Sequence, residues 1–138
     1  MYQDNLKILY FDLKNLKDIE MLLTGGECVI HCATISRRGP ETNSVNVLYP
    51  EIEGIINLLT TCEKQSINRF ILVGCLSNVM TGNYQNVYNE TQNAKPDECD
   101  MYERAKFFVE RCAWSYLLDK KDAIKLTVFL PGLLLGPI

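Results

Sequence analysis

Three short apolar runs, separated by segments of helical period, constrain the fold of this chain more than any other feature. The runs are Cys28–Ala33, Arg69–Cys75 and Leu126–Leu130. They lack the apolar/polar alternation of a strand with one solvent-facing side, so they are typical of strands buried on both faces. Such strands separated by helices predict parallel β-α-β units with right-handed crossovers. The sequence therefore predicts an α/β fold with a doubly wound parallel sheet.

The segments between these runs supply the helices and loops. Three helices are expected, at residues 16–23, 50–64 and 101–118. Pro50 is expected in the first turn of the second helix, where a missing N–H costs no helical hydrogen bond. Leu6–Leu13 is predicted to form a further strand. Two polar stretches are predicted loops, Thr34–Val45 and Ser77–Cys99.

Length, charge and hydropathy narrow the classes of function. The 138 residues fit one domain, spanning 1–138. The net charge of −3, without a basic stripe, argues against a nucleic-acid partner. No apolar run reaches the roughly 18 residues of a membrane span. The polar N-terminus is no secretory leader, so a cytoplasmic location is expected.

The six cysteines are predicted to be free thiols. Cys28 and Cys32 form the only close pair, and they have the spacing of a strand rather than that of a zinc site. The remaining cysteines are spread over apparent strands, helices and loops, as in a protein of a reducing compartment. No metal site is predicted.

Tyr102 and Lys106 are the residues best suited to proton transfer. They stand four positions apart on a predicted helix, so both side chains lie on one face. A phenol normally titrates near 10, and a neighbouring ammonium favours its phenolate form. Such a pair can exchange a proton with a carbonyl or alcohol oxygen. The spacing alone also occurs by chance on surface helices.

In doubly wound sheets, ligands bind at the carboxyl ends of the strands. Residues expected at those ends include Asp12, the stretches 31–34 and 74–79, and Pro131 with Gly132.

Six segments resemble, in order and spacing, the motifs of one family. They are Asp12-Leu13, Gly26–Thr34, Pro50–Leu59, Arg69–Val73, Tyr102–Trp114 and Leu130–Pro137. The family is that of the extended short-chain dehydrogenases/reductases. The chain is most similar to its dihydroflavonol reductase and cinnamoyl-CoA reductase branch, with NAD-dependent epimerases/dehydratases and 3β-hydroxysteroid dehydrogenases as relatives.

The resemblance implies a role for each matching residue. Tyr102 would be the acid/base, and Lys106 would bind the nicotinamide ribose. Asp12 and Leu13 would flank the adenine, and Ala33 would line the cofactor cleft. The residues implied near the nicotinamide amide are Pro131 and Gly132. The implied cofactor is NADP or NAD, which exchanges a hydride with a carbonyl or alcohol carbon.

The chain departs from the family pattern at the catalytic serine. Gly74-Cys75 stands where the family has Ser-Ser, and a thiol is a poorer hydrogen-bond donor than a hydroxyl. Ser77, two residues further on, is the alternative donor if the loop bends.

The glycine-rich phosphate loop of the family is also missing from the sequence. The fold expected is therefore a partial Rossmann-like sheet lacking the first β-α-β unit, truncated at both ends. Either the chain is a fragment, or the strands at 6–13 and 28–33 pair directly.

Three hypotheses of function follow. The first is part of an NAD(P)-dependent oxidoreductase that reduces a carbonyl, or oxidises a secondary alcohol, of an apolar small molecule. The second is a catalytically impaired homologue that acts as a binding module, which the Gly74-Cys75 departure favours. The third is a nucleotide-sugar epimerase or dehydratase, which uses the same Tyr/Lys pair. The resemblance also implies pairing of two copies through helices 50–64 and 101–118.

Overall fold

A three-stranded parallel sheet forms the centre of the computed structural model, which describes residues 5–34, 45–80, 86–120 and 123–136. Its strands are β1 (Val29–His31), β2 (Arg69–Val73) and β3 (Lys125–Phe129), in the order β1-β2-β3. Phe70 of β2 lies opposite Val29 on one side and Leu126 on the other. The parallel α/β sheet predicted from the three apolar runs is confirmed.

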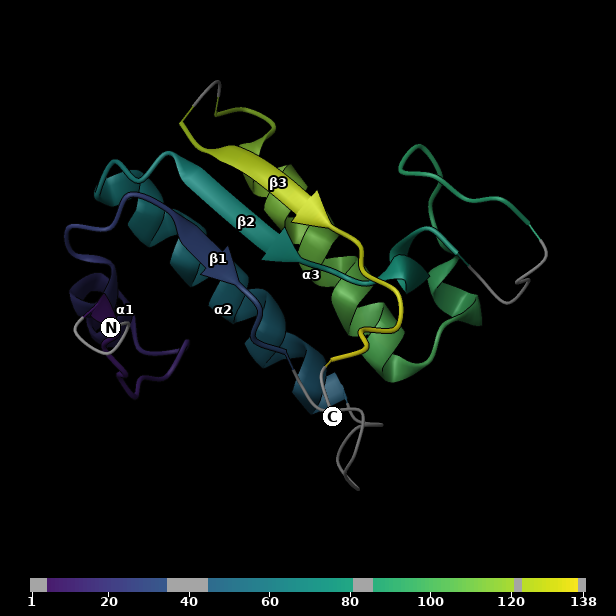
Figure 1. Ribbon diagram of the computed structural model, residues 1–138, viewed down its shortest axis with the longest axis horizontal. Helices are drawn as coiled ribbons and strands as arrows, with labels where there is room; N and C mark the ends of the chain where they lie inside the picture. Colours follow the sequence, from purple (N-terminus) through teal and green to yellow (C-terminus); the bar gives the residue numbers. More distant parts are fainter. Residues whose placement is uncertain (1–4, 35–44, 81–85, 121–122, 137–138) are drawn as a thin grey trace.

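The described helices are α1 (Leu16–Leu23), α2 (Val45–Lys64) and α3 (Met101–Leu117), with two short 3-10 helices, η2 (Leu76–Asn78) and η3 (Pro96–Glu98). Figure 1 shows α2 and α3 side by side across one face of the sheet. The opposite face carries no helix in the part of the chain that the structure describes, and there Ile30 and Phe129 are 63% and 57% exposed. No described helix is long and apolar enough to cross a membrane.

The hydrophobic core lies between the sheet and this helical layer. Phe70 and Leu72 point from β2 into the layer and are almost fully buried. They meet apolar side chains of α2 and α3, and all of these belong to one cluster: Ile55, Leu58, Leu59, Cys62, Val109 and Ala113. Burying these surfaces supplies the main free energy that holds the helices on the sheet.

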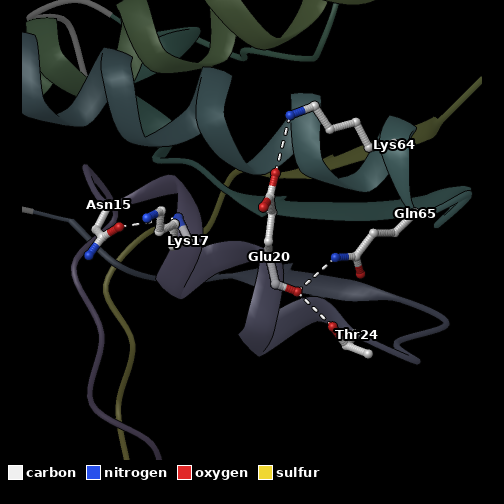
Figure 2. Close-up of polar contacts among 6 residues, drawn as sticks. All are labelled: Asn15, Lys17, Glu20, Thr24, Lys64 and Gln65. Carbon is white, nitrogen blue, oxygen red and sulfur yellow. Dashed lines mark hydrogen bonds and ion pairs between the residues drawn. The ribbon is translucent and has the colours of Figure 1, made fainter.

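Helix α1 is joined to the carboxyl end of α2 by its apolar face and by polar contacts. Ile19 and Leu23 enter the core cluster. The Glu20 carboxylate pairs with Lys64 Nζ at 3.2 Å, and Gln65 Nε2 donates to the Glu20 carbonyl at 2.7 Å (Figure 2). The exposed ion pair adds little, whereas the buried leucine and isoleucine fix the position of α1.

Three predictions about local structure are wrong. Leu6–Leu13 forms no strand: among the described residues β1 pairs with β2 alone, and Leu6, Ile8 and Tyr10 are exposed. Direct pairing of 6–13 with 28–33 is contradicted for the same reason. Helix α2 begins at Val45, so Pro50 lies inside it, where the ring deprives the residue 46 carbonyl of its N–H partner.

The predicted loops agree in part with the structure. The stretch 77–99 contains η3 and overlaps η2, and residues 81–85 lie outside the described part. The stretch 34–45 is described only at its ends, where residue 45 already belongs to α2.

The core predicts a measurable contrast between two leucines. Leu59 is 0% exposed and Leu118 is 77% exposed. We expect Leu59→Ala to lower the free energy of unfolding by about 3 kcal/mol, because it removes buried methyl groups and leaves a cavity. Leu118→Ala, the same chemical change, should cost less than about 0.5 kcal/mol. Equal losses in urea unfolding would contradict this position of the core.

Candidate functional site

The carboxyl ends of the three strands meet at one edge of the sheet, where the chain continues the pairing beyond the ladder. The Gly74 amide donates to the Phe129 carbonyl at 2.8 Å, and the Leu76 amide donates to the Pro131 carbonyl at 2.9 Å. These bonds bring the turn after β2 beside the segment after β3. Pro131 and Gly132 therefore lie next to the turn that carries Cys75 and Ser77.

Helix α3 delivers Lys106 to this edge. Its start is fixed by a capping box in which the Asp100 carboxylate accepts from the Glu103 amide and the Glu103 side chain accepts from the Asp100 amide. Lys106 lies in the second turn and is only 6% exposed. Its Nζ donates to the Val73 carbonyl, the last residue of β2, at 3.1 Å.

Burial lowers the pKa of Lys106, because the ammonium loses hydration. The charges of Glu51, Cys75 and Cys32 oppose this by raising it. Those three residues come from α2, from the turn after β2 and from the end of β1. Lys106 therefore stands where three elements converge on the carboxyl edge.

Tyr102 lies one helical turn before Lys106, in the first turn of α3, and is half-buried. The spacing of four residues on one continuous helix places both side chains on the same side of α3, as predicted. Tyr102 lies between Asp100 and Glu103, the two residues of the capping box, so its backbone belongs to a well-anchored helix start.

His31, at the end of β1, is buried against Phe70, with the ring centroids 6.3 Å apart. Loss of hydration and then the charge of Lys106 lower the pKa of His31 to about 4. The imidazole is therefore neutral at physiological pH.

A cavity of about 340 Å³ opens beside His31. It is lined by Phe11, Asp12, Leu13, Lys14, His31, Pro50 and Glu51. Leu13 is held there by α2: Asn57 Nδ2 donates to its carbonyl at 3.0 Å, and a Cβ on Gly54 would approach the Leu13 side chain to 3.2 Å. Asp12 Oδ1 accepts from the Lys14 amide. The predicted pair Asp12 and Leu13 thus faces a cavity at the sheet edge although the segment before them forms no strand.

The turn after β2 carries the two candidate donors. Cys75 is half-buried and directly precedes η2. Ser77 is 7% exposed, and its Oγ has no hydrogen-bond partner among the described residues. Position 74, directly before them, has no room for a side chain, since a Cβ there would lie 2.9 Å from a Leu130 methyl group.

The structure brings most predicted site residues to one edge, and it adds some that sequence reasoning missed. Lys106, Cys75, Ser77 and the 131–132 segment come together there, and Ala33 follows β1 at the same edge. The sequence analysis gave no site role to Glu51 or Glu110, and it included Asn78 only as part of the stretch 74–79. Only Glu110 had a signal in the sequence, because it stands four positions after Lys106 on the same helix.

All six cysteines are free thiols, as predicted. Among the described residues, no group of three histidine, cysteine or acidic side chains is arranged to hold a metal ion.

A parallel sheet with helices packed on it and a cavity at its carboxyl edge defines a Rossmann-like unit. The profile of one family, described as the NAD dependent epimerase/dehydratase family, matches residues 2–138. The chain belongs to this family.

The curated relatives include reductases of plants. Anthocyanidin reductase of Arabidopsis thaliana is 29% identical over 96% of this chain and 42% of its own length. A bifunctional dihydroflavonol 4-reductase/flavanone 4-reductase of Pyrus communis is 25% identical over 98% of this chain and 41% of its own length. The chain thus spans about two fifths of the length of these relatives.

Solved structures share the fold. A yeast methylglyoxal/isovaleraldehyde reductase in complex with NADPH aligns with a TM-score of 0.72 at 20% identity, over 88% of this chain and 41% of its own. A double mutant of a dTDP-glucose 4,6-dehydratase from Streptomyces venezuelae, with NAD bound, aligns with a TM-score of 0.76 at 16% identity, over 89% and 37%. At these identities the likeness concerns the Rossmann-like fold alone.

The lowered pKa of His31 predicts a pH dependence of stability. The unfolded state binds a proton near pH 6.5, whereas the folded state does so only near pH 4. The folded state is therefore favoured above pH 6.5, and up to about 3 kcal/mol of this preference is lost as the pH falls towards 4. We expect His31→Gln to flatten the pH dependence of urea unfolding over that window. Parallel curves for the two proteins would show that His31 is not buried as described.

Proposed function

We propose that residues 1–138 form part of an NAD(P)-dependent oxidoreductase domain that reduces a carbonyl, or oxidises a secondary alcohol, of an apolar small molecule. The observation that carries this proposal is the placement of Lys106: a buried ammonium held against the last carbonyl of β2, one helical turn from Tyr102. An ordinary surface helix would leave such a lysine in water. Here burial and the Val73 contact direct it to the edge where Rossmann-like sheets bind ligands.

The residues at this edge fit a dinucleotide cofactor, NADP or NAD. The cavity beside Asp12 and Leu13 has an apolar wall for a base and a carboxylate for hydroxyl groups. Ala33 and Gly132 are small and exposed at the same edge, so a ligand can approach the backbone there. When bound, the cofactor supplies a hydride to the substrate carbon.

The chain's own residues would manage the proton and the substrate oxygen. Tyr102 would donate a proton to the oxygen during reduction and accept it during oxidation. The ammonium of Lys106 would stabilise the phenolate that forms and would hold ribose hydroxyls. A thiol or hydroxyl from Cys75 or Ser77 would orient the substrate oxygen, with Pro131 and Gly132 beside the nicotinamide.

Two alternatives are kept because specific observations favour them. Cys75 in place of a serine favours a catalytically impaired homologue that acts as a binding module. Membership of the epimerase/dehydratase family favours a nucleotide-sugar epimerase or dehydratase. The identity of 25–29% to plant reductases supports the reductase reading over both. Pairing of two copies and a cytoplasmic location stay predictions.

Replacing the phenol tests the acid/base role. We expect Tyr102→Phe to reduce turnover at least about a hundredfold, the scale of a lost general acid, while the affinity for NADH or NADPH changes little. The assay follows cofactor oxidation with apolar aromatic ketones and aldehydes in the longest natural chain that carries this sequence. Tyr116→Phe is the matched control, because the Tyr116 hydroxyl lies on the same helix but donates to Glu63. Unchanged turnover in Tyr102→Phe would remove Tyr102 from the mechanism.

Replacing the thiol tests which side chain orients the substrate oxygen. If Cys75 occupies that position, Cys75→Ser should raise kcat by about tenfold, because a hydroxyl is the stronger donor to a developing oxyanion. Cys28→Ser is the control, since Cys28 precedes the opposite, amino end of β1. No gain in Cys75→Ser, with a large loss in Ser77→Ala, would assign the role to Ser77 instead.

A further inference from the structure

Asn78, the last residue of η2, joins the turn after β2 to α3, two elements that carry the proposed site, and also contacts the segment at Ala94. It is 3% exposed. Its Nδ2 donates to the Lys106 carbonyl at 3.3 Å and to Glu110 Oε2 at 2.6 Å, both on α3. Its backbone amide donates to the Cys75 carbonyl, and its own carbonyl accepts from the Ala94 amide at 2.8 Å. One side chain thus links the turn after β2 to the helical turn of Lys106.

The direction of the amide follows from its neighbours. A backbone carbonyl and a carboxylate are both acceptors, so only the NH2 end of Asn78 can face them. The bond to Glu110 is charge-assisted and short, which makes it the stronger of the two. Replacing the amide by a smaller apolar group would leave the buried Lys106 carbonyl without this donor.

Gly74 supplies the space that this amide needs. A Cβ on Gly74 would lie 3.3 Å from Asn78 Nδ2 and 2.9 Å from a Leu130 methyl group. Glycine at 74 and asparagine at 78 therefore fit together. The resemblance places a serine at position 74, so the amide clamp accompanies a departure of this chain from the family pattern.

We propose that Asn78 is a positioning residue that holds the helical turn of Lys106 against the end of β2, and so sets the distance between Lys106 and the turn carrying Cys75 and Ser77. That this contact serves catalysis rests on the proposed oxidoreductase function. The hydrogen bonds of Asn78 to α3 do not depend on that function. Lys106 would otherwise move outward, because a buried ammonium regains hydration in water. Asn78 acts through the backbone of Lys106 and need not touch a substrate.

His31 provides a direct readout of the position of Lys106. It is the one histidine in the sequence, so its imidazole signals in an NMR pH titration need no assignment. Burial and the nearby Lys106 charge hold the pKa of His31 at about 4. We expect Lys106→Met to raise the pKa of His31, because it removes that charge. Asn78→Ala should raise it too, by about half a unit or more, because Lys106 moves away.

Two variants separate positioning from a general loosening of the fold. Gln65→Ala removes a comparable amide-to-carbonyl bond, from Gln65 Nε2 to the Glu20 carbonyl, after the carboxyl end of α2 and outside the cavity that His31 lines, and should leave the pKa of His31 unchanged. Glu110→Gln keeps an acceptor oxygen for Asn78 but removes its charge, so it should raise the pKa of His31 by less than Asn78→Ala does. If Asn78→Ala does not fold, Asn78→Ser replaces it, since a serine hydroxyl is too short to reach both acceptors and should give a rise in the same direction.

An unchanged pKa of His31 in the Asn78 variant overturns the proposal, and so does an equal rise in Gln65→Ala. The titration needs neither cofactor nor turnover. A failure of the oxidoreductase proposal, seen as absent cofactor binding in the wild-type chain, is therefore distinguishable from a failure of the clamp.

Discussion

The hydrogen bond from Lys106 Nζ to the Val73 carbonyl is the interaction on which the candidate site depends. An ammonium taken out of water loses hydration, and the fold must compensate for that loss with acceptors and opposite charges. The Val73 carbonyl, at the end of the central strand, supplies the acceptor. The carboxylate of Glu51, from α2, supplies an opposite charge that raises the pKa of Lys106 against the effect of burial. Burial of a lysine ammonium costs free energy of hydration, and such buried charged groups are concentrated at functional sites.

The parallel sheet explains why these groups meet. All three strands run in the same direction, so their carboxyl ends and the turns that follow them gather at one edge. Helix α3 packs beside α2 with its capped amino terminus towards that edge, which sets Tyr102 and Lys106 beside the turns. The core between sheet and helices fixes this arrangement without taking part in the chemistry.

Elements whose position depends on neighbouring residues in the sequence could be predicted. Helix α1 has the bounds predicted for it, and both of its ends have local causes: the Asn15 side chain accepts from the Lys17 amide at one end, and Gly25, with φ of 76°, follows the other. The three strands were found within a few residues because each is a continuous apolar run. The start of α2 was predicted too late in the sequence, because proline favours the first turn of a helix. In the structure Pro50 lies inside a longer helix that begins at Val45.

Features that depend on distant partners could not be predicted. Leu6–Leu13 has the composition of a strand, but a strand exists only where a neighbour accepts its hydrogen bonds. The shared face of Tyr102 and Lys106, by contrast, follows from their spacing of four residues on one helix. The clamp from Asn78 to α3 joins residues 28 and 32 positions apart, so no local pattern indicates it. The proximity of Glu51 to Lys106 likewise arises only from the packing of α2 beside α3.

The most direct test of the site is an NMR titration of the ¹⁵N-labelled chain with NADH and with NADPH at millimolar concentration. A site at the carboxyl edge predicts that the perturbed backbone amides converge on Leu13, Ala33, Lys106 and Gly132, and that Lys106→Met weakens the response. Spectra that do not change with either cofactor, or changes clustered at the amino ends of the strands, would contradict it.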